Sequence, residues 1–240
     1  MTIELKRGMR SRFCIYFSLL NILSVVLGYI LLVTIDKLQT VTFQDMFESV
    51  YTVYTQFGTL LFSALIIMQF YIDYKEKNIA FYKTLGFSEY RYFLAKVGMI
   101  LLATIVGSFL ASAIICLPYG KLNLLPIVFL KIESVMIYYT LIISTISFIF
   151  SNFLVAFFTN VFLWIMGIVI SAGSSFMQYF AYYDASTADY QYLMSYLDGK
   201  VNMSELLQHI AGNYIYDLAI LVICIIVIWL SHGRWVKNGI

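Results

Sequence analysis

Long stretches without a single charged residue constrain this chain more than any other feature of its sequence. The longest is residues 134–183, where fifty consecutive positions carry no Asp, Glu, Lys or Arg. One helix of that length would measure about 75 Å at 1.5 Å per residue, more than twice the thickness of a bilayer core. The stretch therefore has to fold back on itself, and we expect the turn at Ser151 and Asn152.

The composition indicates that lipid, rather than water, surrounds the fold. Of the 240 residues, 62% are hydrophobic and only 12% are charged, whereas soluble proteins carry about 25% charged residues. The mean hydropathy is +0.86. A net charge of +2 gives no indication of nucleic-acid binding. We expect one membrane domain that covers residues 1–240.

The apolar runs predict an all-α integral membrane fold with six spans. The run Phe13–Ile35 has 23 uncharged residues, longer than the roughly 7–15 residues of a signal peptide's hydrophobic region, so we expect it to stay uncleaved. The run Phe57–Ile72 is short for a bilayer, so that helix should begin earlier, near Val53. The predicted spans are residues 13–35, 53–72, 97–117, 127–150, 154–176 and 214–231.

Basic residues gather on one side of this topology. Four lie in an amphipathic segment at residues 1–12, five lie in Asp73–Lys96, and two lie in the C-terminal tail. The positive-inside rule places these segments and both termini in the cytoplasm. The acidic, tyrosine-rich segment 177–213 then lies outside, where we expect short helices at the interface. The chain is thus predicted to be a multi-pass protein of a plasma membrane.

The charged segment Asp73–Lys96 has the pattern of a short interfacial helix. Ile79, Tyr82 and Leu85 recur at three-residue steps and so share one helix face. Gly86 is suited to end this helix, and Ser88 is suited to N-cap the next one. The apolar face needs a covering, which favours contact with a partner protein. The alternative is a solvated loop that only follows the positive-inside rule.

Small residues on the third span form two neighbouring ridges at four-residue spacing. One ridge is Ala103, Gly107 and Ala111, and the other is Thr104, Ser108 and Ser112. Small residues allow helix backbones to approach closely in lipid, so we expect ordinary helix packing here. A moving contact or a dimer contact is the alternative.

Polar residues inside the predicted spans are few. Asn21, Gln69 and Asn160 are expected to form interhelical hydrogen bonds, with a role along a substrate path as the alternative. Lys131 and Glu133 are expected near the interface, where a lysine can reach water and a glutamate can reach water or a partner.

Motifs for catalysis and metal binding are absent from the sequence. It contains no GxxxxGK[ST], HExxH or GxSxG motif. The dispersed Cys14, Cys116 and Cys224 indicate apolar packing rather than a disulfide or zinc site. His209 and His232 stand alone and are expected on the surface. We therefore expect no catalytic residue, metal or cofactor in this chain. A membrane enzyme that uses Glu133 or Asp217 is a disfavoured alternative.

These features together resemble the membrane subunits of ABC-type exporters of the second export class. The matching features are the basic N-terminal segment, the six spans, the cytoplasmic helix after span two and the long external segment after span five. The stretch EKNIAFYKTLGFSEYRYFLAK, Glu76–Lys96, is similar to the family's coupling region. There an acidic residue closes span two, a small break follows the helix, and a lysine opens span three. The resemblance assigns the ATPase interface to Glu76, Gly86 and Lys96, with the contact face Ile79, Tyr82 and Leu85.

Within that class, a chain of this length is most similar to small bacterial permeases for peptide export or self-immunity, of the lantibiotic-immunity or epipeptide type. The resemblance implies a separate ATP-binding subunit that holds ATP and Mg, a peptide substrate, and a second permease chain that is identical or related. Nucleotide binding would draw the Asp73–Leu85 helices of two permeases together and tilt the spans. The alternative function is a non-transporting membrane protein that binds or shields against a peptide, or anchors partners.

Overall fold

The computed structural model describes residues 7–8, 12–171, 173, 182–183, 189 and 191–239. Within this part of the chain every regular element is helical, and six helices are long and apolar enough to cross a membrane. The predicted all-α fold with six spans is confirmed. The spans are α2 (Phe13–Thr34), the continuous α3 (Phe43–Thr52), η1 (Val53–Phe57) and α4 (Gly58–Lys75), then α6 (Glu89–Cys116), α7 (Leu125–Ile149), α8 (Phe153–Ser171) and α10 (Met203–Leu230).

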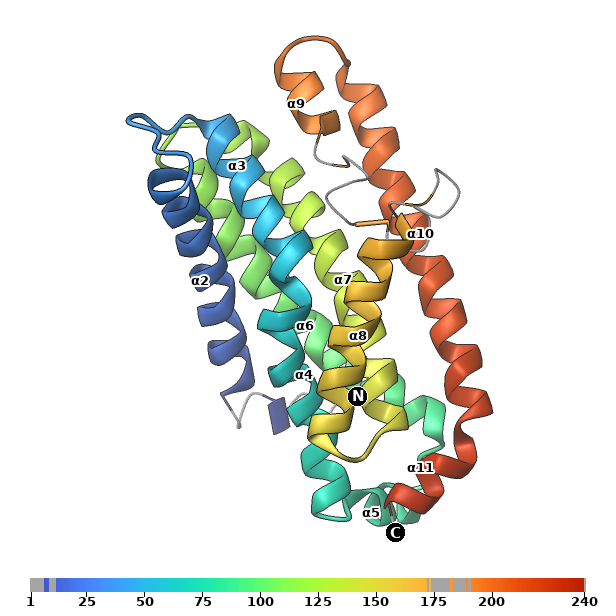
Figure 1. The fold of residues 1–240 in the computed structure, drawn as a ribbon. Coiled ribbons are helices and arrows are strands. Elements are labelled where there is room, and N and C mark those ends of the chain that lie inside the picture. The colour runs from blue at the N-terminus through green and yellow to red at the C-terminus, as the bar shows by residue number, and fades with distance from the viewer. Residues whose placement is uncertain are drawn as a thin grey trace.

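The helix α7 is the centre of the bundle (Figure 1). It packs against α4, α6, α8 and α10, while α6 also packs against α2. Accordingly, α7 is the most buried span, and α8 and α10 are the least buried. Their outward faces carry large apolar side chains that suit contact with lipid, such as Phe158 and Phe162 on α8 and Ile215 and Leu218 on α10.

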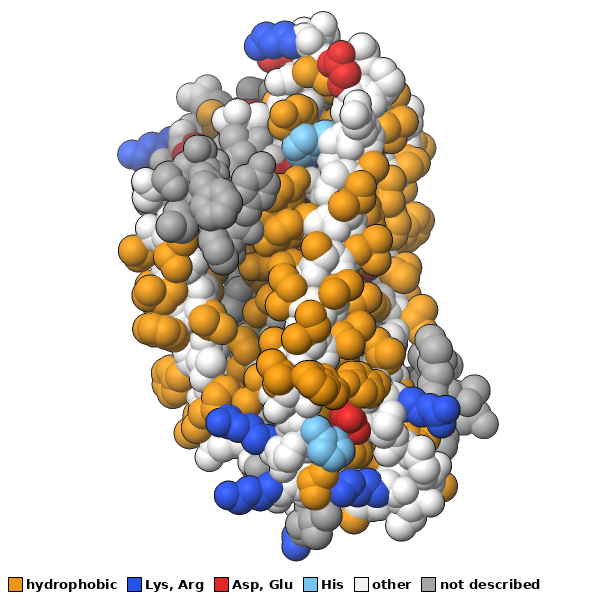
Figure 2. Space-filling view, turned by 90° about the vertical axis from the view of Figure 1, so that its right-hand side faces the viewer, with side chains coloured by type: hydrophobic (Ala, Val, Ile, Leu, Met, Phe, Trp, Pro, Cys, Tyr) orange, Lys and Arg blue, Asp and Glu red, His pale blue; other side chains and the backbone are white. Residues whose placement is uncertain are grey.

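Three short helices mark the two ends of the bundle. The helices α5 (Asn78–Thr84) and α11 (His232–Gly239) pack together at one end, and α9 (Gln191–Leu197) lies at the opposite end (Figure 1). We call these the α5 end and the α9 end. Figure 2 shows hydrophobic side chains covering the middle of one face, with charged side chains gathered at both ends. This distribution is that of a membrane-spanning protein.

The second span starts ten residues earlier than predicted. The sequence predicted a start near Val53, whereas α3 begins at Phe43, with Thr42 as its N-cap in a capping box with Asp45. The first turns of α3 are amphipathic, because Phe43 and Phe47 are buried while Gln44, Asp45 and Glu48 face outward. A search for uniformly apolar residues misses such an end.

The sixth span also starts earlier than predicted. Its helix α10 begins at Met203 rather than near Tyr214, with Asn202 as its N-cap. Residues 203–213, which were predicted to belong to the external segment, therefore form one continuous helix with the sixth span. As in α3, this part of the helix has one buried face, which includes Leu206, Ile210 and Asn213, and most of its other residues are exposed.

Several predicted helix ends are confirmed. The fold-back lies at Ser151 and Asn152, where the Asn152 carboxamide oxygen accepts hydrogen bonds from the first turn of α8. Gly86 follows α5 with φ of +73°, a conformation that favours glycine. Ser88 N-caps α6. The predicted end of span five at residue 176 and most of the segment 1–12 lie outside the described residues.

Candidate functional site

A buried carboxylate, Asp73, joins three segments at the α5 end. It lies in the last turn of α4 and is fully buried. Lys96 of α6 places its Nζ 2.7 Å from Asp73 Oδ2, and the Tyr92 hydroxyl donates to the same oxygen at 3.0 Å. The Arg7 guanidinium donates to the other oxygen, Oδ1. We call Arg7, Asp73, Tyr92 and Lys96 the Asp73 cluster, and it ties the N-terminal segment to α4 and α6.

Two residues assigned by resemblance to ATPase coupling meet at this cluster. Lys96 belongs to it and is almost fully buried. Glu76 lies at its edge, with an exposed side chain whose carboxylate is 3.9 Å from the Arg7 guanidinium. Asn78 links the two acids, because it donates to Asp73 at 3.2 Å and to Glu76 at 3.0 Å. The sequence reading missed Asp73, because it counted this residue with the water-exposed charges of the segment.

The helix α5 turns part of its predicted contact face inward. Ile79 and Tyr82 are buried. The Tyr82 ring packs against Phe87 and Tyr92 with centroids 5.5 and 5.2 Å apart. Leu85 is 46% exposed, as predicted for a contact residue. The ATPase-coupling role of these residues stays a prediction.

The outward face of α5 also holds Phe81, which the sequence did not indicate as a contact residue. Phe81 is 57% exposed and lies one turn from Leu85, and Gly86 follows in the exposed loop. On its inner side α5 rests on α11, with Lys83 Nζ 5.6 Å from the Trp235 ring centroid. Trp235 in turn stacks on Phe148 of α7. Through these contacts, a movement of α5 would be transmitted to α6, α7 and α11.

The first small-residue ridge of α6 packs against α2 within the chain. Ala103, Gly107 and Ala111 are all buried. A Cβ added at Gly107 would lie 2.4 Å from Asn21 Nδ2. Asn21 donates to the Phe17 carbonyl at 2.8 Å and accepts from the Tyr54 hydroxyl at 2.7 Å. Asn21 therefore forms the interhelical hydrogen bond that the sequence predicts, and Gly107 leaves room for it.

Two residues of the second ridge bind a buried carboxylate. The Thr104 hydroxyl donates to Glu133 Oε1 at 2.7 Å, and the Ser108 hydroxyl donates to Oε2. Glu133 is buried between α6 and α7. Glu133 was expected to reach water or a partner, and in the structure the Thr104 and Ser108 hydroxyls are its partners.

A second buried ion pair connects the spans at the α9 end. Lys131 of α7 places its Nζ 2.7 Å from Asp189 Oδ1, and its side chain has no solvent exposure. Tyr51 of α3 donates to the other oxygen of Asp189, and Asn213 of α10 donates to this carboxylate at 3.2 Å. His209 Nδ1 lies 3.3 Å from Asp189 Oδ1. We call these five residues the Asp189 cluster.

The Asp189 cluster corrects two expectations. Lys131 does not extend to water, and His209 does not stand alone on the surface, because both contact Asp189. Burial alone would raise the pKa of Asp189, but the charge and hydrogen bond of Lys131, with the hydrogen bond from Tyr51 and the charge of His209, lower it below its ordinary value of 3.8. Asp189 is therefore ionised at neutral pH, and it anchors the segment before α9 onto three spans.

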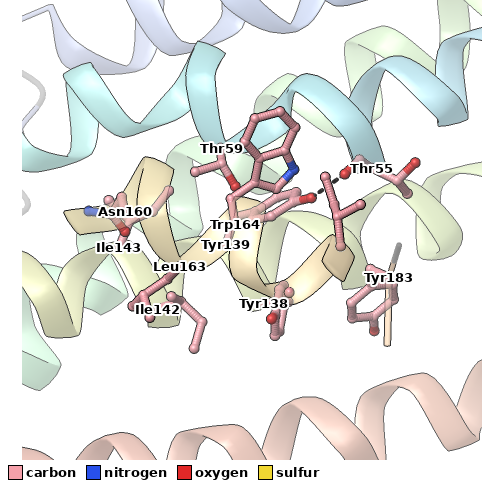
Figure 3. Close-up of a pocket in the computed structure, with 12 residues that line it drawn as sticks. Thr55, Thr59, Tyr138, Tyr139, Ile142, Ile143, Asn160, Leu163, Trp164 and Tyr183 are labelled. Carbon is pink, nitrogen blue, oxygen red and sulfur yellow. Dashed lines mark hydrogen bonds between the residues drawn. The ribbon is translucent and has the colours of Figure 1, made fainter. Parts of the chain in front are cut away.

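A small cavity lies between α4, α7 and α8 (Figure 3). Its volume is about 70 Å³. Asn160 of α8, one of the predicted path residues, lines it and is buried. Gln69 is half-buried on α4 and does not line it. The full lining is Thr55, Thr59, Tyr138, Tyr139, Ile142, Ile143, Asn160, Leu163, Trp164, Gly167, Ile168 and Tyr183.

A π-helical turn shapes one wall of this cavity. In η1 the backbone bulges, and the Thr55 carbonyl accepts a hydrogen bond of 2.5 Å from the Tyr139 hydroxyl of α7. Gly58 allows this approach, because a Cβ there would lie 2.6 Å from the Tyr139 ring. Such π-turns are frequent at functional sites. Within the part of the chain that the structure describes, no group of three His, Cys, Asp or Glu side chains could hold a metal ion.

Comparison with known proteins identifies the family. The chain matches the model of the peptide export permease protein YydJ family over residues 1–240. The chain belongs to the YydJ family of peptide export permeases. A curated relative, the probable peptide export permease protein YydJ of Bacillus subtilis (strain 168), is 31% identical over 241 residues, which is 100% of both chains. No solved structure matches the chain.

Membership of the YydJ family confirms the predicted resemblance to small peptide-export permeases. The chain is therefore a multi-pass membrane protein of a permease family.

Proposed function

We propose that the chain is the membrane-spanning subunit of a peptide exporter, driven by ATP that a separate subunit hydrolyses. The observation that carries this proposal is the match to a peptide export permease family along all 240 residues. Six spans in a bundle with a buried central helix provide the scaffold that such a permease needs. The ATP-binding subunit would hold ATP and Mg, and this chain would contribute the peptide path.

The charge distribution supports an orientation with the α5 end in the cytoplasm of a bacterium. The α5 end holds Arg7, the basic residues of Asp73–Lys96, and the tail with Arg234 and Lys237, whereas the α9 end carries Asp198 and Glu205. The positive-inside rule places the basic end inside. Both termini are then cytoplasmic, and α5 faces the compartment that contains ATP.

In this proposal α5 transmits the motion of the ATP-binding subunit. Its exposed Phe81 and Leu85 offer apolar anchors for a groove on that subunit. Tyr82 and the Asp73 cluster connect α5 to α4, α6 and the N-terminal segment. A nucleotide can drive transport only by favouring one arrangement of these segments over another. A second permease chain, identical or related, would complete the pore.

Comparison of exported peptides tests the proposed function. Cells that make the chain are compared with cells that lack it, and peptides in the medium and in the cells are identified by mass spectrometry. The proposal predicts that, in cells that lack the chain, one peptide is missing from the medium and accumulates inside the cells. Restoring the unsubstituted chain should restore release. An unchanged peptide content in both fractions would support the non-transporting alternative, in which the chain binds or shields against a peptide.

A further inference from the structure

The cavity between α4, α7 and α8 contains two polar atoms without a hydrogen-bond partner. They are Asn160 Oδ1 and Trp164 Nε1, and both atoms are buried. The two residues are four apart on α8, so they share one face of the helix. Both line the same cavity (Figure 3).

The orientation of the Asn160 carboxamide is determined by its other atom. Asn160 Nδ2 donates to the Ala156 carbonyl at 2.9 Å. Exchanging the carboxamide oxygen and nitrogen would bring two oxygens together and lose this bond. Asn160 therefore offers a hydrogen-bond acceptor, its Oδ1, while Trp164 offers a donor, its indole N–H.

Leaving both groups unpaired is costly in this setting. A buried polar group without a partner costs roughly 1–3 kcal/mol, and the surrounding lipid supplies no water that could reach it from the side. Most buried polar atoms in proteins have a partner, and an exception requires a reason. Because a water needs at least ~10–15 Å³ of such volume, a cavity of about 70 Å³ has room for a ligand group larger than one water.

Apart from Thr55 and Thr59, the rest of the lining is apolar or aromatic. Ile142, Ile143 and Leu163 contribute aliphatic surface, and the Tyr139 hydroxyl is already engaged by the Thr55 carbonyl. Mostly apolar walls with a few placed polar groups are typical of ligand sites. One acceptor and one donor on such walls match the N–H and C=O of a single peptide group next to an apolar side chain.

We propose that this cavity binds one backbone amide of the exported peptide together with the apolar side chain beside it. The peptide N–H donates to Asn160 Oδ1, and the peptide C=O accepts from Trp164 Nε1. An ester-linked lipid does not fit equally well, because its ester groups accept hydrogen bonds but donate none to Asn160. This inference rests on the proposed function and names the substrate group that the permease would hold.

Two small probes of nearly the same shape test the inference. N-methylisovaleramide carries one secondary amide and an isobutyl group, whereas methyl isovalerate has an ester in place of the amide. The chain contains three tryptophans, so Trp229→Phe with Trp235→Phe leaves Trp164 as the sole indole emitter. The protein is purified in detergent, each probe is titrated, and the shift of the Trp164 emission is recorded.

We expect a saturable shift with the amide, and binding of the ester that is weaker by roughly tenfold, as the loss of one hydrogen bond predicts. Asn160→Leu should remove this preference, because it removes the acceptor. Thr159→Val is the matched control, since Thr159 is the neighbouring residue but does not line the cavity. The control should keep the preference.

The same titration on the unsubstituted chain and on Trp164→Phe provides a second measurement, in case the variant with two replaced tryptophans does not fold. Equal binding of amide and ester, an unchanged preference in Asn160→Leu, or the absence of a saturable shift would overturn the inference.

The peptide-release experiment separates the two proposals. Release that depends on the chain, together with no amide preference, would refute the cavity site alone. Tighter binding of the amide than of the ester, without peptide release that depends on the chain, would refute the exporter function.

Discussion

At the scale of single residues, two buried aspartates hold together segments that are far apart in the sequence. Asp73 binds Lys96 and Arg7 at the α5 end, and Asp189 binds Lys131 at the α9 end. Removing one partner of a buried ion pair leaves an uncompensated charge, which costs more than the intact pair contributes. Both clusters should therefore be sensitive to single substitutions.

The substitution Lys131→Met should lower the free energy of unfolding by about 3–5 kcal/mol, because it leaves Asp189 charged and buried. The matched control is Lys200→Met, which removes an ion pair with Asp198 of almost the same length, 2.9 Å, but on the exposed surface. The control should change stability by less than about 1 kcal/mol. Thermal unfolding of the purified protein in detergent measures both, and equal effects of the two substitutions would contradict the assignment.

The pH dependence of stability should report the ionisation of Asp189. Its pKa is lowered in the folded protein, so its contribution is present above the ordinary value of 3.8 and is lost as the pH falls through the lower folded pKa. The groups that face it are Lys131, Tyr51 and His209.

Over the range from about pH 7 to about pH 3, we expect the stability difference between the unsubstituted chain and Asp189→Asn to shrink below about pH 4. Melting temperatures of the two proteins across this range provide the measurement. A difference that is unchanged at about pH 3 would show that Asp189 does not hold its charge in this way.

Residue roles at these clusters could be predicted only in part. The position of Asn21 within a span was apparent from hydropathy, and Asn21 is buried in the structure. Lys96 was counted with the water-exposed charges of its segment, whereas it is also buried. Lys131 was expected to reach water, and Glu133 to reach water or a partner, because a sequence cannot show that Asp189, 58 residues away, or Ser108 on another span would be the partner. Such pairings depend on tertiary packing.

At the scale of helices, uniformly apolar segments were predicted well and amphipathic ends were not. The fold-back at Ser151 and the break at Gly86 are where local chemistry places them. The starts of α3 and α10 were missed, because each extends beyond the apolar region with only one buried face. Hydropathy averages over the whole circumference of a helix and so does not detect that face.

The contact of α6 with α2 leads to a prediction about glycine. Gly107→Ala should destabilise the protein by about 1–3 kcal/mol, because its Cβ would meet Asn21 in a packed interface. Gly212→Ala on α10 is the matched control, since no atom lies within 4 Å of a Cβ there. That control should be neutral or stabilise by up to about 1 kcal/mol. Thermal unfolding of both variants checks this, and a tolerant Gly107 would show that the contact is loose.

The exposure of α5 can be tested by cysteine labelling. The chain's own Cys116 and Cys224 are buried and Cys14 is half-buried, so background labelling should be low. We expect Phe81→Cys to react quickly with a maleimide that cannot cross the membrane, applied to inside-out vesicles, and Ile79→Cys to react slowly.

The matched control for this labelling is Leu122→Cys, which is equally exposed at the opposite end of the bundle. It should react only in right-side-out preparations. Protection of Phe81→Cys, but not of Leu122→Cys, by the ATP-binding subunit would support α5 as its docking site. Rapid labelling of Leu122→Cys in inside-out vesicles would refute the proposed orientation.

At the scale of the whole molecule, the bundle combines a tightly packed centre with loosely covered outer helices. The buried α6 and α7 connect both clusters, whereas α8 and α10 expose most of their surface. The Asp73 cluster lies at the end proposed to meet ATP, and the small cavity lies within the spans. Motion of α5 would therefore reach the proposed amide site through α4 and α7, which both line the cavity.

The most direct test of the exporter account is the composition of the complex that this chain forms. The chain is purified from gently solubilised membranes, and the proteins that accompany it are identified and quantified. The account predicts an ATP-binding subunit in fixed proportion to the permease, with loss of that subunit when Phe81 and Leu85 are both replaced by serine. Recovery of the folded chain alone, with its spans intact, would contradict the account.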